Sequence, residues 1–387
     1  MQYLRLILLI LLTYSNLFAF DVIVPGLHYK HLTLKNSAQS IHLLVADPHK
    51  VNIKIGIAHN KCASAEKTSE ISKNQKALAA INGGYFDFGC KNKIQDTIIK
   101  VLDCLGYSRY KAFPMWTLCK DQRYYAVSHN FTGAMCWNNS DQAPLFYAIK
   151  TVLSLYINNV AYQVTEFNKP NPKGPTLYSS CYDKITPSFH EPVDEIMIQD
   201  DHIVQIYRSS HGKNKIPSNG WVYVIPQNHA KEMIPVDLGD RVVVTFSNMQ
   251  KPDLIPELPD SAWNKMDNIV AATPLLLCNG AIPPYLNDYT SDFYTKRHPR
   301  SAVGVCKNGN WVFLVVDGRA KHSEGFTILE LAQFMKTLGC VGALNLDGGG
   351  SSTMVVQDKV VNSPSGREHA LVRKERPVSN AFLICLK

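Results

Sequence analysis

The sequence predicts an α+β fold with mixed sheets, in which a C-terminal strand, helix and strand unit carries the functional residues at its strand ends. Residues 311–316 form a continuous apolar run rich in β-branched side chains, which indicates a buried strand. Residues 327–338 then repeat apolar side chains at helical intervals. Residues 341–346 form a second strand-like run. A right-handed crossover through the helix makes the two strands parallel.

Each of these two strands ends at a carboxylate. Asp317 follows the first strand and Asp347 follows the second. Parallel strands that are neighbours or next but one bring these carboxylates about 5–10 Å apart at one edge of the sheet. Paired carboxylates at such separations perform acid and base chemistry on glycosidic bonds. Asp347 and Asp317 are therefore the candidate catalytic residues.

A glycine-rich turn follows Asp347. Gly348, Gly349 and Gly350 permit positive φ angles and close approach of a ligand to the main chain, and their amides can form an anion-binding nest. Ser351 and Ser352 add hydroxyl donors. An ordinary glycine hairpin capped by the aspartate is the structural alternative.

The N-terminal residues 1–19 have one arginine, an apolar run and small or polar residues at the end, which predicts a secretory signal peptide. We therefore expect a secreted or periplasmic protein without a transmembrane segment in the mature chain. Residues 20–77 alternate apolar and polar side chains, as antiparallel strands do, and residues 68–76 are a short helix candidate.

A second glycine turn ends an apolar run at Asn82. Asn82, Gly83, Gly84 and Tyr85 are predicted to contact the substrate, with Asn82 as an amide donor and Tyr85 or Phe86 as a sugar-stacking surface. A plain hairpin in which Asn82 satisfies its own turn is the alternative.

Three arginines lie close to the predicted strand ends. Arg297 and Arg300 precede a strand, and Arg319 follows Asp317 by two positions. The guanidinium group binds phosphate through two parallel hydrogen bonds, so these residues are predicted to bind a substrate phosphate. A solvated loop before the strand is the alternative. The histidines lack metal-ligand spacing, and we expect neither a metal nor a cofactor.

Composition excludes some partners and suggests a compartment. The net charge of +8 over 387 residues is modest, and no dense basic block predicts nucleic-acid binding. Ten cysteines in an exported chain permit disulfides, with Cys90 and Cys104, and Cys119 and Cys136, as plausible local pairs. The sequence gives no indication of oligomeric state.

Taken in order, these motifs resemble the phosphodiester glycosidase family, whose best-known member releases N-acetylglucosamine from its phosphodiester link to mannose 6-phosphate. Ser301 stands where threonine is usual in that family, and we recognise none of the family's motifs in residues 91–220. The matching segments are 82–86, 273–276 with Gly280, 297–304, 317–319, 325–332, 345–354 and 375–380.

The resemblance implies a phosphodiester glycosidase-like domain over residues 78–387, after the strand-rich segment 20–77. It implies a secreted hydrolase that cleaves a glycosidic bond of a sugar-1-phosphodiester or a related amino-sugar glycan. The partner is then a carbohydrate or sugar-phosphate substrate. Two alternatives remain: a non-catalytic glycan-binding module, and a hydrolase of an exopolysaccharide or cell-wall glycan that acts without phosphate.

Overall fold

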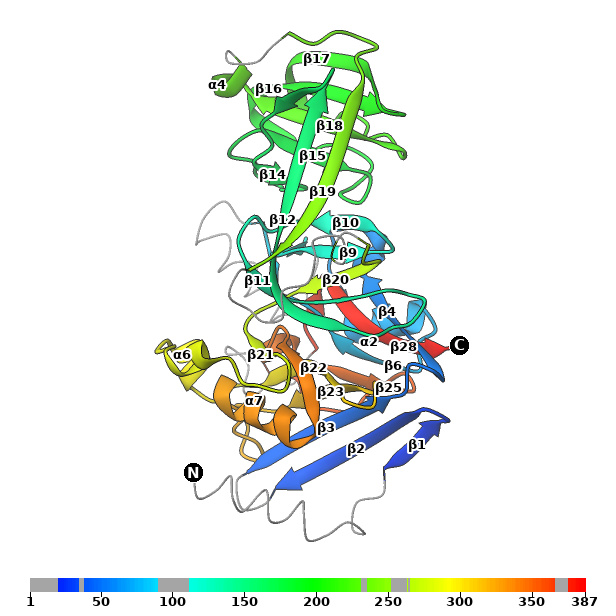
Figure 1. The fold of residues 1–387 in the computed structure, drawn as a ribbon, viewed down its shortest axis with the longest axis vertical. Helices are drawn as coiled ribbons and strands as arrows, with labels where there is room; N and C mark the ends of the chain where they lie inside the picture. The colour runs from blue at the N-terminus through cyan, green and yellow to red at the C-terminus, as the bar shows by residue number, and fades with distance from the viewer. Residues whose placement is uncertain are drawn as a thin grey trace.

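The protein is a β-rich molecule in which a seven-stranded and a five-stranded sheet pack together (Figure 1). The described residues also form a second seven-stranded sheet, a second five-stranded sheet and two two-stranded sheets. The computed structural model describes residues 20–34, 38–89, 111–230, 235–251, 263, 265–365 and 375–387. Of these residues, 50% lie in strands and 11% in helices, so the predicted α+β class is wrong. The predicted signal peptide lies outside the described residues.

The first sheet holds seven strands, and every neighbouring pair is antiparallel. It combines the start of the chain with its C-terminal third. In spatial order the strands are β1 (Asp21–Val24), β2 (Leu27–Leu34), β3 (Gln39–Ala46), β23 (Trp311–Val316), β22 (Arg300–Cys306), β24 (Cys340–Asn345) and β21 (Leu275–Leu277).

The second sheet holds five antiparallel strands and also joins distant parts of the chain. Because both sheets use strands from before and after residue 77, the two segments are interleaved in space. The strands are β26 (Lys359–Val360), β25 (Met354–Val356), β6 (Ala79–Asn82), β28 (Asn380–Leu386) and β4 (Val51–Ile57).

These two sheets pack face to face, and a helix covers each outer face. Along β23, Phe313 points into the core between the sheets, where it meets Phe382 of β28. The alternate residue Leu314 packs against helix α7 (Ile328–Thr337). On the far side, Leu383 of β28 packs with helix α2 (Thr68–Asn74). Burial on both faces explains why these strands are continuous apolar runs.

The second seven-stranded sheet and the second five-stranded sheet are formed mainly by the middle of the chain. In Figure 1 the long strands β12 and β19 lead from the sandwich to the sheet at the top. One sheet contains β10 (Arg123–Ala126), β9 (Leu118–Lys120), β20 (Asn268–Ala271), β11 (Thr132–Trp137), β12 (Leu145–Ile157) and β13 (Val160–Tyr162), with β19 (Val242–Gln250) paired to β12. The other contains β14 (Glu166–Phe167), β15 (Thr176–Ser179), β18 (Gly220–Pro226), β16 (Ser188–Gln199) and β17 (His202–Gly212).

Short elements complete the described chain. The two-stranded pairs are β5 (Glu66–Lys67) with β27 (Pro377–Val378), and β7 (Phe86–Asp87) with β8 (Phe113–Pro114). The short helices are α4 (Gln227–Ala230), α6 (Asp292–Thr295), η2 (Ala58–Asn60), η3 (Pro284–Asn287) and η4 (Gly349–Ser351). Within the described ranges, no helix is long and apolar enough to cross a membrane.

The cysteine geometry corrects one predicted disulfide. Cys119 of β9 and Cys136 of β11 both pair with Ile269 of β20, from opposite sides, and both thiols are free. Two strand spacings separate them by about 10 Å, whereas disulfides need Cα atoms within about 7 Å. The pairing of Cys119 with Cys136 is therefore wrong. Cys90 and Cys104 lie outside the described residues.

The capping box of α7 gives a stability prediction. The Thr327 hydroxyl accepts a hydrogen bond from the Glu330 amide at 3.1 Å, and the Glu330 carboxylate accepts one from the Thr327 amide at 2.9 Å. Thr327→Ala should lower the free energy of unfolding by about 1 kcal/mol. Thr327→Ser keeps the hydroxyl and should retain most of the stabilisation that the cap provides. Urea unfolding followed by circular dichroism measures both. Equal stability of the two variants would show that the cap hydroxyl contributes nothing.

Candidate active site

The predicted carboxylates lie at the same edge of the first sheet. Strand β22 lies between β23 and β24 and is antiparallel to both, so β23 and β24 run in the same direction. Asp317 and Asp347 follow the ends of β23 and β24. Next-but-one strands lie about 10 Å apart. The unit of strand, helix and strand is thus present, although β22, which precedes it in the chain, separates its two strands.

Glycines at this edge allow the chain to pack tightly around Pro299, which precedes β22. A Cβ atom on Gly318 would approach the Pro299 nitrogen to 2.5 Å, and one on Gly348 would approach the Pro299 carbonyl oxygen to 2.8 Å. Both distances are shorter than side chains tolerate. The glycines after the two aspartates therefore let neighbouring segments meet.

The two predicted glycine motifs meet at Asp347. Its amide donates to the Gly83 carbonyl at 3.1 Å, and its carbonyl accepts from Asn82 Nδ2 at 2.7 Å. The Asn82 Oδ1 accepts from the Ser301 hydroxyl at 2.7 Å and from the Thr353 amide. Asn82 is fully buried, so its side chain holds the two turns together. A hydrogen bond from the Asn82 side chain to a substrate stays a prediction.

The carboxyl group of Asp347 is in an environment that favours its neutral form. The Ser351 hydroxyl donates to Oδ2 at 2.6 Å, and the residue is partly buried. Burial raises the pKa of Asp347 above its ordinary value, against the opposing effects of the Arg376 charge and the hydrogen bond from Ser351. Asp347 is therefore a stronger base than an exposed aspartate.

Two arginines flank the glycine turn beside Asp347. A Cβ atom on Gly350 would lie 2.8 Å from Arg376 Nη2, and one on Gly349 would lie 3.1 Å from Arg319 Nη1. Gly349 also has a φ of +62°, which favours glycine. Arg319 and Arg376 thus both lie beside the glycine turn, and phosphate binding by Arg319 stays a prediction. Arg376 belongs to the 375–380 motif, and sequence inspection did not single it out as a site residue.

Tyr85 lies next to this group as part of an aromatic and polar wall. Its hydroxyl donates to the Thr273 carbonyl at 3.0 Å and accepts from Asn345 Nδ2 at 2.7 Å. Its ring contacts Trp116 edge to face at 5.0 Å. Burial, together with the charge of Asp347, raises the pKa of Tyr85 well above its ordinary value, so the hydroxyl is neutral. Phe86 instead contacts Phe88.

Buried polar atoms with unused hydrogen-bonding capacity lie along the same segments. The Asn345 Oδ1 and Ser352 Oγ atoms are buried and have no hydrogen-bond partner among the described residues. A buried polar group without a partner is costly, and a bound ligand is one of the ways in which such a group is satisfied. The Gly84 amide already has a partner within the protein, because it donates to Asn380 Oδ1 at 2.9 Å.

The other two predicted arginines are engaged elsewhere. Arg297 is on the surface and forms ion pairs with Glu324 and Glu330. Arg300 is buried, and its guanidinium donates to the carbonyls of Phe326, Phe293 and Lys296 at 2.8, 2.6 and 3.2 Å. Burial lowers the pKa of Arg300 to about 10. Arg300 therefore links helix α6 to the start of β22. Phosphate binding by Arg297 or Arg300 stays a prediction.

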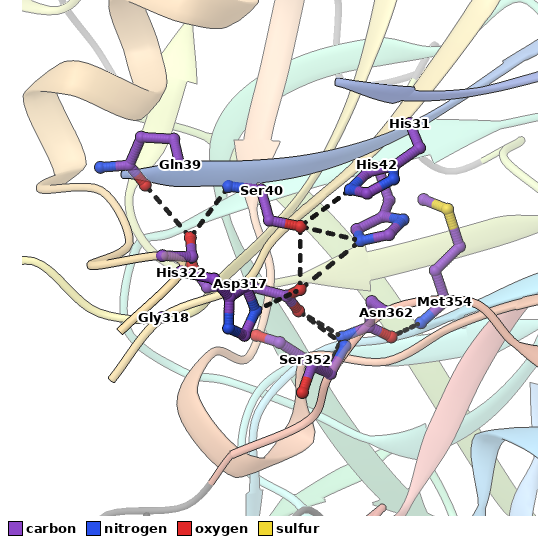
Figure 2. Close-up of polar contacts among 12 residues, drawn as sticks. His31, Gln39, Ser40, His42, Asp317, Gly318, His322, Ser352, Met354 and Asn362 are labelled. Atoms are coloured by element: carbon purple, nitrogen blue, oxygen red, sulfur yellow. Dashed lines mark hydrogen bonds and ion pairs between the residues drawn. The ribbon is translucent and has the colours of Figure 1, made fainter. Parts of the chain in front are cut away.

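Asp317 is the centre of a separate hydrogen-bonded network (Figure 2). Its Oδ2 accepts from the Ser40 hydroxyl at 3.1 Å and lies 3.5 Å from Nε2 of both His42 and His322. Its Oδ1 accepts from Asn362 Nδ2 at 3.1 Å and from the Ser363 amide at 2.8 Å. The Asp317 carboxylate is thus surrounded by donors on both oxygens.

This network holds Asp317 in its ionised form. Burial acts to raise the pKa of Asp317, but the interaction with His42 and the hydrogen bonds from Ser363 and Asn362 outweigh it and lower the pKa to about 2. Asn362 Nδ2 also donates to the Ser352 carbonyl, and its Oδ1 accepts from the Met354 amide. Asp317 is thereby linked to the segment that follows the glycine turn.

Sequence inspection did not predict the histidines of this network. His31 lies stacked on His42 with ring centroids 4.3 Å apart, and its Nε2 is 3.0 Å from the Ser40 Oγ. Alternate positions 40 and 42 on a strand share one face, which is a weak signal that many strands carry. Within the part of the chain that the structure describes, no group of three or more His, Cys, Asp or Glu side chains is arranged to hold a metal ion.

The fold and site together define a β-sandwich protein with a carboxyl group and two guanidinium groups at a glycine turn. Residues 194–385 match the phosphodiester glycosidase family, which confirms the resemblance of the motifs to that family. The matched region contains Asp317, Asp347 and Arg376, whereas the Asn82 turn precedes it.

Known proteins are similar to parts of this chain. The SPbeta prophage-derived uncharacterized protein YomE of Bacillus subtilis (strain 168) is 42% identical over 20% of this chain and 12% of its own length. The N-acetylglucosamine-1-phosphodiester alpha-N-acetylglucosaminidase of Bos taurus is 41% identical over 17% of this chain and 12% of its own length. The chain thus spans only about an eighth of either relative.

A solved structure supports the fold over most of the chain. A candidate exported protein from Burkholderia pseudomallei K96243 has a TM-score of 0.71 and 20% identity, over 90% of this chain and 74% of that protein. At this identity the likeness concerns the fold alone.

The low pKa of Asp317 predicts a specific dependence of stability on pH. Because the folded pKa lies below the unfolded value of about 3.9, Asp317 stabilises the fold above pH 4, and this contribution of about 2 kcal/mol is lost as the pH falls toward 2. Asp317→Asn should lower the free energy of unfolding at pH 7 and flatten its slope between pH 4 and 2. Urea unfolding across this range measures it.

The control for this experiment is Asp358→Asn, which changes an exposed aspartate with a positive φ that asparagine also adopts. It should retain the wild-type slope. A slope for Asp317→Asn equal to that of the wild type would show that Asp317 is not the group that titrates.

Proposed function

We propose that this protein is an exported hydrolase that cleaves the glycosidic bond of a sugar-1-phosphodiester or a related amino-sugar glycan. The observation that carries the proposal is the position of Asp347, whose pKa is raised by burial, beside Arg376 and a glycine turn that Arg319 also approaches. The match of residues 194–385 to a family of phosphodiester glycosidases supports it.

In the proposed reaction, a water molecule attacks the anomeric carbon and the phosphate leaves with the bonding electron pair. The carboxylate of Asp347 accepts the proton of the attacking water, and a raised pKa makes it a better base than an ordinary aspartate. A phosphodiester oxygen is already a weak base, so its departure requires neutralisation of charge more than protonation.

The guanidinium groups supply that neutralisation. Arg376 lies close to Gly350 and Arg319 lies close to Gly349, and a forked guanidinium binds phosphate oxygens through two hydrogen bonds. The buried Ser352 hydroxyl is the additional donor in this proposal, whereas the Gly349 amide already donates to the Pro299 carbonyl at 2.9 Å. Tyr85 and Asn345 border the sugar side.

Asp317 has a different role in this scheme. Both of its carboxylate oxygens accept hydrogen bonds, it is only 3% exposed and its pKa is about 2, so it neither gives nor receives a proton near neutral pH. Its link through Asn362 to the Ser352 carbonyl fixes the segment after the glycine turn. We assign Asp317 to positioning and Asp347 to catalysis.

Export is the second part of the proposal. The apolar run within residues 1–19 has the composition of a signal peptide. N-terminal sequencing of material from a fractionated expression host tests it, since an exported chain begins near residue 20 and an unprocessed chain begins at Met1.

Replacement of Asp347 distinguishes catalysis from binding. Asp347→Asn keeps the size of the side chain but removes the base, so hydrolysis should fall about a hundredfold or more, with ligand affinity and melting temperature little changed. The substrates are a panel of sugar-1-phosphodiesters and phosphate-free amino-sugar polymers, with products identified by mass spectrometry.

Each outcome of this panel decides between the candidates. Binding without turnover by the wild type would support a glycan-binding module. Turnover confined to phosphate-free polymers would support a glycan hydrolase that acts without phosphate. Activity of Asp347→Asn within a few-fold of wild type would remove Asp347 from catalysis.

Replacement of Arg376 tests the phosphate side. Arg376→Lys keeps the positive charge and loses the fork, so turnover of a phosphodiester should fall roughly tenfold to a hundredfold. Arg208→Lys is the control, because Arg208 pairs with Asp194 in the far sheet. Steady-state kinetics should show wild-type values for the control. An equal, small effect of both substitutions would contradict a role of Arg376 in phosphate binding.

A further inference from the structure

Cys306 and Cys340 are directly opposed across two strands of the main sheet. Cys306 ends β22 and Cys340 begins β24, and the two residues are register partners. Opposed residues in a regular antiparallel pair have Cα atoms about 4.5–5.5 Å apart, within the range of about 4.4–6.8 Å that disulfides require. The register shifts between Val305 and Cys306, but Cys306 and Cys340 are still partners after the shift. This pair therefore meets the spacing that Cys119 and Cys136 fail.

We propose that Cys306 and Cys340 form an intramolecular disulfide when the protein meets a disulfide oxidant. Both thiols are free in this structure, and the bond is an oxidative modification of the folded chain. The proposal concerns stability and does not depend on the substrate.

The surroundings of the two sulfurs give them different roles. Cys306 is partly exposed, and its thiol donates to the Leu338 carbonyl just beyond α7 at 3.5 Å. Cys340 is 3% exposed, and its Sγ would lie 3.0 Å from a Cβ atom on Gly304. The absence of a Cβ at Gly304 thus leaves room for the buried sulfur. An oxidant reaches Cys306 first.

The ionisation of the pair agrees with this order. A hydrogen bond with Cys340 lowers the pKa of Cys306, against the opposing effect of burial, while the same interaction and burial raise the pKa of Cys340. Thiol exchange proceeds through the thiolate, so the more exposed and more acidic Cys306 is the attacking group.

The reaction balances with a low-molecular-weight disulfide such as oxidised glutathione. The Cys306 thiolate attacks the oxidant and forms a mixed disulfide, releasing one thiolate. The Cys340 sulfur then attacks the Cys306 sulfur and releases the second. Two protein thiols are oxidised to one disulfide and one oxidant disulfide is reduced to two thiols, with the two protons passing to the released thiolates.

The resulting bond would close a loop that contains β23 and α7. It lies at the opposite end of β22 from Arg300, about 20 Å along a seven-residue strand. The candidate active site lies at the other end of these strands, where β22 begins and where β23 and β24 end. A bond at this end therefore restricts the unfolded chain, which is how disulfides stabilise, without touching Asp317 or Asp347.

The test is peptide mapping of the purified full chain after incubation with oxidised glutathione, alkylation of free thiols and digestion without reductant. The expected result is a cross-linked peptide pair containing Cys306 and Cys340. Recovery of both residues as separately alkylated thiols, or of either residue joined to another cysteine, would overturn the proposal.

A thermal measurement provides an independent check. Reductant should lower the melting temperature of the oxidised wild type by about 5 °C more than that of oxidised Cys306→Ser. Cys385→Ser, which removes another partly buried cysteine, should respond as the wild type does. If Cys306→Ser and Cys385→Ser lose the same amount on reduction, the pair contributes no cross-link.

Discussion

The antiparallel pairing of β22 with both β23 and β24 is the constraint on which the candidate active site depends. Because β22 begins where its two neighbours end, the residues before it and the residues after both neighbours converge on one edge. Gly318 and Gly348 then allow those neighbours to close around Pro299. Sheet register thus assembles a site from segments that no local interaction would bring together.

The same edge places two aspartates in opposite electrostatic environments. Asp317 has donors on both oxygens and a lowered pKa, whereas burial of Asp347 outweighs its arginine neighbour and raises its pKa. Pairs of titratable groups whose pKa values move apart are typical of sites that divide structural and proton-transfer roles. The division proposed for this protein follows from the number of donors around each carboxylate.

Local patterns predicted the elements of this edge more accurately than the fold class. The capping box at Thr327, the strand before Asp317 and the strand before Asp347 are present as predicted. The α+β class is wrong because the described residues between 111 and 251 add strands β8 to β19 and, among helices, only α4. Strand β12 does alternate buried and less buried side chains, but such alternation indicates a strand without showing how many strands the whole chain pairs into sheets.

The sequence by itself determined which backbone segments end in carboxylates and glycines, since apolar runs and turn residues act over a few positions. Only the tertiary structure decided what surrounds them. The Ser40 hydroxyl donates to Asp317, which is 277 positions away in the sequence. Arg376, which precedes another pair of strands, lies beside the glycine turn. Arg297 forms ion pairs with carboxylates, and Arg300 donates to backbone carbonyls. Such contacts depend on strand order, and strand order is set by burial over the whole chain, which no local pattern records.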